Sequence, residues 1–282
     1  MKIKWILLMS LIPLNCNTNH LPTYTQLGDL RILTLIATPP EALPGQTIAL
    51  TPVLSDLNGQ GRTLTYSVEA CMDPGVSRGV QPQCQNPDST NQLSGTTTLP
   101  AGTSQTYTGS IASLSITLPQ SSIAFAAATP AMQYNGTNYL IFYTLSASAG
   151  NSSVRSFVRV TLSTKTPQNQ NPILTSINRN DTPILSIFQT PEASTNFNIT
   201  IPSSSFETYS ILKNDGSLIS QTETLSSTWF ISDGSFNSDL TIGSDENSWT
   251  PPSPKPTSRG SVILVVTTDS RYGAAFQKIE MN

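Results

Sequence analysis

The chain has 282 residues, which fits two β-sandwich domains of about 100 residues each with connecting segments. Only 11% of the residues are charged and the net charge is -3, so no basic stripe is available to follow a phosphate backbone, and we expect no nucleic-acid partner. Ile, Val, Thr, Phe and Tyr recur throughout, and this composition excludes a disordered chain.

The first 15 residues have the pattern of a signal peptide. Lys2 and Lys4 precede an apolar run from Trp5 to about Leu14, the arrangement of a positive n-region and a short hydrophobic h-region. This run is too short to cross a bilayer, which takes about 20 apolar residues. We therefore expect residues 1–15 to be removed on export.

Cys16 follows this run directly. The stretch MKIKWILLMSLIPLNC resembles the lipobox of bacterial lipoproteins, in which the signal is cut before the cysteine and the cysteine is acylated. The resemblance implies that the membrane is a partner through acylated Cys16 and that the protein lies in the bacterial cell envelope, at the outer membrane on its surface or periplasmic face. Several acyl chains make such an anchor stable. A lipobox usually has a small residue where this chain has Asn15, and an ordinary signal peptide cut between Asn15 and His20 is the alternative.

Cys71 and Cys84 are the two cysteines left for the folded part of the chain. An exported protein folds in an oxidising compartment, where such a pair forms a disulfide. A metal site would need further Cys or His ligands close by, and the one histidine, His20, lies near the N-terminus. The sequence therefore predicts a Cys71–Cys84 disulfide.

Residues 16–28 show no periodicity and are predicted to form a flexible tether. A first module follows at 29–164, where short apolar or alternating runs end at Pro and Gly turn signals. Its runs are RILTLIATPP, TIALTPVL, TLTYSVEAC, SIASLSITLP, NYLIFYTLSAS and SSVRSFVRVTLST. Residues 165–171 read as a polar linker bounded by prolines.

The second module, residues 172–282, repeats this scheme. Its runs are ILTSINR, PILSIFQ, TNFNITIP, TYSILKN, TLSSTWFIS, RGSVILVVTTDS and AAFQKIEM. In each module an apolar strand, a Gly-containing turn and an alternating last strand close the sequence, which indicates one unit used twice. Many short strands and almost no amphipathic helix predict an all-β fold of two tandem antiparallel β-sandwiches.

Two stretches of the second module, TWFISDGSF and SVILVVTTDSRYGAA, resemble the PKD-type branch of immunoglobulin-like domains. The resemblance implies that Trp229 is the core aromatic residue and that Asp233 and Gly234 form a turn. The first module has Val68 near the place of Trp229. PPEALPG and TYSVEAC also resemble segments of a group of uncharacterised bacterial lipoproteins. These motifs are turn and core signals, so they imply a fold and no activity.

Four acidic residues lie close together in the second module, and hard cations such as Ca²⁺ take several carboxylate oxygens. They are Asp233, Asp239, Asp245 and Glu246. Their spacing does not match an EF-hand, and Asp is also favoured in turns for its own hydrogen bonds, so both interpretations stay open. No other metal and no cofactor is expected. His20 lies in the predicted tether and no G-x-S-x-G segment is present, so no catalytic triad is indicated, and we expect no enzymatic activity.

Three aromatic residues are candidates for ligand contact. Trp249 precedes a Thr-Pro-Pro loop, and Tyr134 and Tyr139 flank Asn135 and Gly136. Exposed aromatic rings stack on sugars or anchor protein partners, whereas burial at the end of a sandwich is the alternative. The sequence thus favours a non-enzymatic binding or adhesion protein, with the two sandwiches as a stalk and a protein or glycan ligand. A periplasm-facing structural or accessory subunit of an envelope complex is the alternative.

Overall fold

The computed structural model describes residues 24–59, 61–75, 82–99, 107–147, 152–185, 187–253 and 260–282. The predicted signal peptide, Cys16 and the predicted Gly-containing turn of the first module, at residues 149–151, lie outside these residues. Antiparallel strands dominate the described part, which confirms the predicted all-β sandwich class. No helix in the described segments is long and apolar enough to cross a bilayer.

Two sheets form the first sandwich. One contains β1 (Arg31–Thr38), β3 (Thr47–Asp56), β6 (Tyr107–Ser110) and β7 (Leu114–Thr117), with β3 pairing to the other three. The other has the order β2 (Glu41–Ala42), β9 (Ser153–Leu162), β8 (Thr137–Ala147), β4 (Thr63–Met72) and β5 (Leu93–Thr98). Two short helices, α1 (Ser121–Ala124) and α2 (Pro130–Asn135), lie between β7 and β8. The predicted run SIASLSITLP is therefore divided between β6 and β7.

The second sandwich also has two sheets. One has the order β17 (Leu240–Ile242), β15 (Ser226–Ile231), β19 (Ser261–Thr268) and β20 (Ala274–Met281). The other has the order β11 (Thr182–Pro183), β10 (Ser176–Arg179), β12 (Thr195–Thr200), β18 (Asn247–Thr250) and β16 (Ser235–Phe236). A separate hairpin pairs β13 (Thr208–Leu212) with β14 (Leu218–Thr222). The run PILSIFQ does not form a continuous strand, because only its first residue belongs to β11 and Phe188 makes an isolated bridge to Met281.

The strand pairings repeat between the two sandwiches. The order β4-β8-β9 in the first corresponds to β15-β19-β20 in the second, and β1-β3-β6 corresponds to β10-β12-β18. The last strand of each receives a parallel partner, β2 on β9 and Phe188 on Met281. Val68 and Trp229 occupy matching strands, and both are buried in the core of their own sandwich. Both modules are immunoglobulin-like β-sandwiches.

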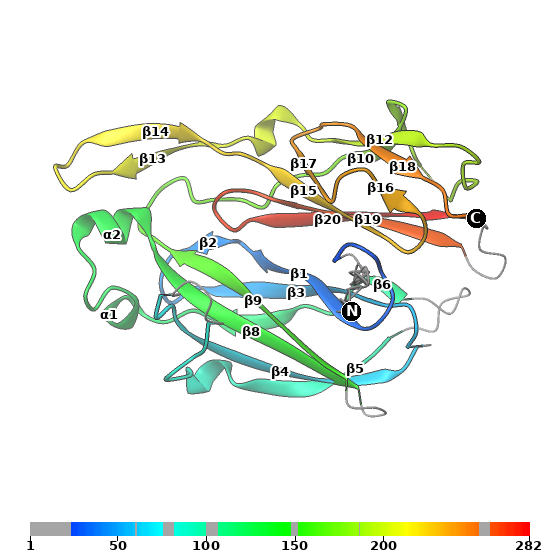
Figure 1. Ribbon diagram of the computed structural model, residues 1–282. Coiled ribbons are helices and arrows are strands. Elements are labelled where there is room, and N and C mark those ends of the chain that lie inside the picture. The colour runs from blue at the N-terminus through cyan, green and yellow to red at the C-terminus, as the bar shows by residue number, and fades with distance from the viewer. Residues whose placement is uncertain are drawn as a thin grey trace, which may run out of the picture.

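The two sandwiches pack face to face, which gives four β layers in one body (Figure 1). Leu33 and Val53, on the outer face of β1 and β3, meet Phe230, Leu264 and Val266 from β15 and β19 in a shared apolar cluster. The first seven residues of β19 are all buried, because both faces of this strand are covered. The two modules that were expected to form a stalk are therefore stacked on each other, and the apolar outer faces of β1, β3 and β19 are the physical reason.

Residues 25–27 contact the folded body, so the predicted flexible tether does not extend to residue 28. Leu27 is buried in the apolar cluster between the sandwiches. Its backbone N–H donates to the carbonyl of Ile231 at 2.7 Å, and the N–H of Ile231 donates to the carbonyl of Thr25 at 3.0 Å. This short segment therefore adds to the edge of the second sandwich before the chain enters the first.

Arg271, in the turn between β19 and β20, is the centre of a polar cluster at the same junction. Its guanidinium forms ion pairs with Glu207 and Glu223 of the second sandwich and with Glu41 of the first, the last at 3.2 Å. The Arg271 Nη2 also donates to the Asn169 side-chain oxygen at 2.9 Å. The side chains of Glu41 and Glu223 are each 1% exposed. One arginine thus forms ion pairs with three carboxylates, two of which the packing removes from water.

Side-chain amides join the two sandwiches at two further places. Asn135, at the end of α2, accepts from the N–H of Leu212 at 2.8 Å and donates to its carbonyl at 2.7 Å, which holds the β13–β14 hairpin over α2 (Figure 1). Asn171 donates to the carbonyl of Ala37 at 2.8 Å and accepts from the N–H of Ala274 at 2.9 Å. Asn171 belongs to residues 165–171, whose role as an interdomain linker stays a prediction.

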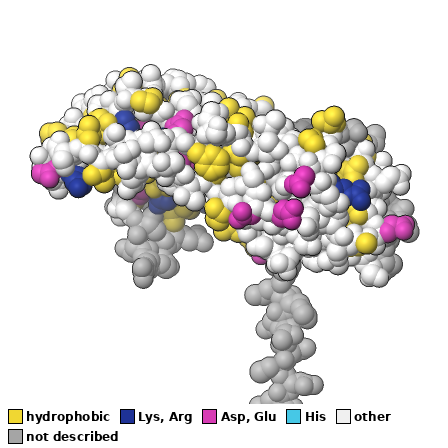
Figure 2. Space-filling view, turned by 90° about the horizontal axis from the view of Figure 1, so that it is seen from above, with side chains coloured by type: hydrophobic (Ala, Val, Ile, Leu, Met, Phe, Trp, Pro, Cys, Tyr) yellow, Lys and Arg dark blue, Asp and Glu magenta, His cyan; other side chains and the backbone are white. Residues whose placement is uncertain are grey.

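Uncharged polar groups dominate the surface in Figure 2. White backbone and uncharged polar side chains cover most of this face, and lysines and arginines occur only in small separate groups. This pattern follows from a composition in which 11% of the residues are charged. On the face shown, no continuous basic surface is offered to a polyanion.

The glutamates around Arg271 make stability depend on pH. Burial raises the pKa of Glu207 and of Glu223 above the ordinary value of 4.5, although Arg271 acts in the opposite direction. Between pH 4.5 and the raised pKa, the folded state binds more protons than the unfolded chain. This contribution to stability is therefore complete below pH 4.5 and is lost as the pH rises through the raised pKa. Glu41, Asp269 and Lys165 are the other charged groups that interact electrostatically within the cluster.

We predict that Glu223→Gln flattens this dependence. The free energy of unfolding of the variant, measured by urea denaturation from pH 4.5 to neutrality, is expected to fall less with pH than that of the wild type. The matched control is Glu280→Gln, at an exposed ion pair with Lys278. Equal slopes for wild type and Glu223→Gln would contradict the assignment.

Candidate functional site

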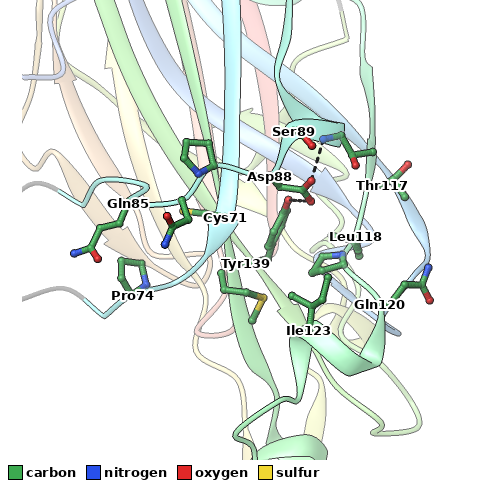
Figure 3. Close-up of a pocket in the computed structure, with 15 residues that line it drawn as sticks. Cys71, Pro74, Gln85, Asp88, Ser89, Thr117, Leu118, Gln120, Ile123 and Tyr139 are labelled. Atoms are coloured by element: carbon green, nitrogen blue, oxygen red, sulfur yellow. Dashed lines mark hydrogen bonds between the residues drawn. The ribbon is translucent and has the colours of Figure 1, made fainter.

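A cavity of about 650 Å³ opens at one end of the first sandwich. The end of β4, the segment 85–90, the segment 117–120 and α1 form its walls (Figure 3). Three other cavities among the described residues, of about 270, 430 and 150 Å³, are smaller. Concave sites that combine apolar walls with a few convergent polar groups are the usual binding sites of proteins, so this cavity is the candidate functional site.

The Cys71–Cys84 disulfide borders the cavity, which confirms the predicted pairing. The two Cα atoms lie 5.7 Å apart, and both cysteines pack with Leu140 and Phe142 on the outer face of the sheet. The backbone N–H of Asp88 donates to the carbonyl of Ala70 at 2.7 Å. The disulfide and this hydrogen bond together attach the segment 84–88 to β4, so one wall of the cavity is fixed at both of its ends.

Asp88 and Tyr139 form the polar floor of the cavity. The Tyr139 hydroxyl donates to the Asp88 carboxylate at 2.9 Å and accepts from the Asn91 side-chain amide at 2.8 Å. Asp88 also caps the 3₁₀ turn at Ser89–Asn91 by accepting from the N–H of Thr90 at 2.9 Å, a role for which Asp is favoured. Burial raises the pKa of the Tyr139 hydroxyl, so this group stays a neutral donor at ordinary pH.

Apolar side chains form part of the cavity lining, which also contains uncharged polar side chains. Pro74, Pro87 and Pro119 face it together with Leu118 and Ile123, and Ile123 of α1 is 60% exposed. The fixed φ of each proline limits how far these walls can move. Among the lining residues Asp88 is the only charged one. The site is therefore suited to a ligand with apolar surface whose polar group is neutral or cationic.

The structure places the three aromatic candidates apart from one another. Tyr139 lines the cavity but is 1% exposed, so its ring face is not available for stacking on a ligand. Tyr134 is partly buried on α2, beside the ammonium group of Lys165. The interpretation of Trp249 as an exposed ligand contact is wrong. It is fully buried, because its side chain on β18 points into the core, where its ring packs edge-on against Phe197.

The turn after β15 follows the predicted signature. Trp229 is fully buried and its ring N–H donates to the Thr241 hydroxyl at 2.9 Å. Gly234 has a φ of +82°, and a Cβ there would lie 2.5 Å from the Thr250 carbonyl oxygen and 2.7 Å from the Trp249 ring nitrogen. Only glycine fits this position without strain. Asp233 precedes it, and its carboxylate accepts from the Ser232 hydroxyl at 2.6 Å. These residues position the core and offer no ligand surface.

The four acidic residues considered for calcium engage separate partners. Asp239 accepts from the Thr25 hydroxyl at 2.6 Å, and Glu246 accepts from the Asn196 side chain at 2.9 Å. Asp245 lies in a turn, where its N–H donates to the carbonyl of Ile242. Across the described segments no group of three or more His, Cys, Asp or Glu side chains could hold a metal ion. The arrangement of these acids is that of turn residues.

Sequence reasoning missed Asp88 and Asn91. The one local signal was the segment Pro87-Asp88-Ser89-Thr90, in which an Asp before Ser and Thr is typical of a helix N-cap. That signal predicts a turn but not a cavity. The contact of Asp88 with Tyr139 spans 51 residues of sequence, and only the pairing of β4 with β8 brings the two together.

Removal of the disulfide is predicted to cost about 3 kcal/mol of unfolding free energy, because the crosslink no longer restricts the unfolded chain. The variant is Cys71→Ala with Cys84→Ala, and urea denaturation measures the loss. The wild type with its disulfide reduced serves as a control that lacks the two substitutions. A loss of less than about 1 kcal/mol would contradict this account of its stabilising role.

Comparisons with known proteins identify no family for this chain. No family model matches it, and no curated protein matches it. Among solved structures, dimeric latent PorU from Porphyromonas gingivalis aligns at 8% identity and a TM-score of 0.24, over 90% of this chain and 24% of that one. Trypsin-activated alpha-2-macroglobulin from Escherichia coli aligns at 11% identity and a TM-score of 0.27, over 90% and 18%.

The adhesin InvE of Yersinia pseudotuberculosis aligns at 13% identity and a TM-score of 0.21, over 88% of this chain and 58% of that one. The chain thus spans less than two thirds of each of these structures. TM-scores this low carry no argument about function, so the proposal below depends on the residues of this chain.

Proposed function

We propose that this chain is a lipid-anchored bacterial envelope protein that binds a ligand without acting on it chemically. The observation that carries the proposal is the cavity beside the Cys71–Cys84 disulfide. Its wall is crosslinked and its polar floor is already hydrogen-bonded, so little ordering is required when a ligand enters. Preformed sites of this kind bind with a smaller loss of conformational entropy.

A binding role agrees with the chemistry of the floor. Asp88 accepts hydrogen bonds from Tyr139 and from the N–H of Thr90, and the raised pKa of Tyr139 keeps its hydroxyl protonated. Among the described residues neither group forms a hydrogen bond with a Ser or Thr hydroxyl that it could activate as a base, and the Cys71 thiol is oxidised in the disulfide. The ligand we propose has an apolar part that lies along Ile123 and a neutral or cationic group that faces Asp88.

The anchor in this proposal is Cys16, and the location is the outer membrane. Support comes from the signal-peptide pattern and the lipobox-like segment before Cys16. The PKD-type assignment of the second module belongs to the same proposal, supported by Trp229 in the core and the left-handed Gly234 in the turn. The anchor is tested by growing cells with labelled palmitate: the label is expected in the wild type and absent from Cys16→Ala. Label in both variants would contradict Cys16 as the anchor.

Proteinase treatment of intact cells decides which side of the membrane the body faces. An immunoblot against the second module is expected to lose its signal while a periplasmic control protein survives. Full protection would contradict surface exposure and favour the alternative, a periplasm-facing structural or accessory subunit. Crosslinking and co-purification with one endogenous envelope complex would then be the expected result.

The cavity itself is tested with two matched isoleucines. Ile123, at the cavity, is 60% exposed, and Ile173, in the second sandwich, is 57% exposed. The probe is an array of purified extracellular-matrix proteins and glycans. Binding by the wild type is expected to be lost in Ile123→Asp, because a hydrated carboxylate replaces the apolar surface along which the ligand lies, and to persist in Ile173→Asp. Equal binding by both variants would exclude this cavity as the site.

A further inference from the structure

Lys165, which follows β9 at the junction of the two sandwiches, is a buried cation between two tyrosine rings. The residue is 5% exposed. Its ammonium nitrogen lies 5.6 Å from the ring centre of Tyr134 on α2 and 5.3 Å from that of Tyr209 on β13. Aromatic faces attract a cation, but they offer no lone pair for any of its three N–H donors.

The ammonium group of Lys165 has no acceptor in the described part of the chain, where Nζ forms neither a hydrogen bond nor an ion pair. Glu41, whose negative charge acts electrostatically on Lys165, already has other hydrogen-bond partners. The carboxylate of Glu41 accepts from the Ser163 hydroxyl, the N–H of Asn169 and the guanidinium of Arg271. Buried charges in proteins are normally paired. Burial accordingly lowers the pKa of Lys165, with Glu41 opposing this effect and Arg271 adding to it.

A second cavity, of about 270 Å³, opens beside Lys165, with walls from both sandwiches. Three charged residues line it: Glu41, Lys165 and Arg271. Arg271 pairs with Glu41 at 3.2 Å and also with Glu207 and Glu223, so Lys165 is the charged group of this lining that has no hydrogen-bonded partner among the described residues. Four further lining residues carry hydrogen-bond donors on side chains that make no hydrogen bond among the described residues. They are Asn138, Thr161, Ser270 and Tyr272.

We propose that this junction cavity binds a small organic monoanion, whose carboxylate accepts hydrogen bonds from Lys165. A ligand with one negative charge would pair with the Lys165 ammonium group. The hydroxyl and amide groups around it suit a ligand that also carries hydroxyls. Glu207, Glu223 and Asp269 lie around Arg271 outside the lining and disfavour a dianion. The site is separate from the disulfide cavity. Its ligand would contact both sandwiches and so strengthen their junction.

The test uses the full chain in detergent with ¹⁵N-labelled lysine. Sodium acetate and sodium glucuronate are titrated while the Lys165 ammonium resonance is followed by NMR, and the resonance is assigned from its absence in Lys165→Met. Saturable shifts with both carboxylates, weaker shifts with inorganic phosphate and none with sodium chloride are expected. No saturable shift would overturn the proposal and leave water as the partner of Lys165. A shift with chloride equal to that with acetate, or tighter binding of phosphate, would overturn it as well.

Calorimetric titration with glucuronate provides the mutational test. Lys165→Met is expected to weaken binding by roughly 10- to 100-fold, the effect of losing a charge-assisted hydrogen bond. Lys213→Met, at an exposed lysine beyond β13, is the matched control and should keep wild-type affinity. Equal affinity in both variants would overturn the assignment. If Lys165→Met does not fold, Lys165→Arg, which keeps the positive charge, supplies the assignment of the resonance, and the wild-type NMR titration decides. Neither the NMR titration nor the calorimetric titration depends on Ile123 or on the side of the membrane that the protein faces. The proposal for this site can therefore fail while the proposed function holds, and the reverse.

Discussion

Arg271→Met is expected to lower the free energy of unfolding by about 3–5 kcal/mol, the range for removing one partner of a buried ion pair. Without the guanidinium, Glu41 and Glu223 would remain buried with no cationic partner of comparable proximity, and each side chain is 1% exposed in the folded protein. The loss is expected to shrink as the pH falls, because protonation removes the uncompensated charges. Urea denaturation at neutral and acidic pH measures both effects.

The matched control for this variant is Arg155→Met. Arg155 pairs with Glu69 at 3.1 Å, where the two side chains are 39% and 51% exposed, and exposed pairs of this kind contribute about 0–1 kcal/mol. If Arg271→Met cost no more than Arg155→Met, the Arg271 cluster would be unimportant for joining the two sandwiches. A loss that did not depend on pH would instead point to packing, not charge, as the cause.

Local patterns in the sequence predicted the all-β class and the disulfide. Strand runs and turn residues recur at short spacing, and a pair of cysteines in a chain with a signal-peptide pattern favours a disulfide. The Asp233-Gly234 turn was predictable for the same reason, since the left-handed φ of Gly234 is a local demand that glycine alone meets at low cost.

The stacking of the two sandwiches left a signal in the sequence that was not used. SVILVVTT of β19 is a continuous apolar run, and such a run indicates a strand buried on both faces. A sandwich strand that faces solvent on one side would alternate, as β5 does. The apolar residues Leu264 and Val266 therefore already indicated that something covers the outer face of this sheet, although not which element.

Neither cavity could be predicted from the sequence, because each depends on residues that are distant along the chain. Asp88 meets Tyr139 through strand pairing, and Lys165 meets Tyr209 only because two sandwiches pack together. Trp249 was misread because a Thr-Pro-Pro loop follows it, whereas its strand alternates inward and outward and places the ring inside. Long-range packing, which a single sequence does not display, decides each of these cases.

Leu264→Asp is expected to separate the two sandwiches at a cost of about 2–5 kcal/mol, the range for losing a large buried apolar side chain. Leu264 is fully buried in the apolar cluster between them. A carboxylate there either stays without water, which is costly, or regains water when the sandwiches part. Small-angle X-ray scattering should then show a larger radius of gyration, and thermal unfolding should divide into two transitions.

Leu240→Asp is the matched control, since Leu240 belongs to the same sheet and is 50% exposed. It is expected to keep the wild-type radius of gyration and a single unfolding transition, because the new carboxylate stays in water. A Leu264→Asp variant with the same behaviour would mean that the apolar cluster does not hold the sandwiches together. In another outcome the variant has a larger radius of gyration and still binds glucuronate in the cavity beside Lys165. That result would mean that the Lys165 site belongs to one sandwich, because a site shared by two sandwiches is lost when they separate.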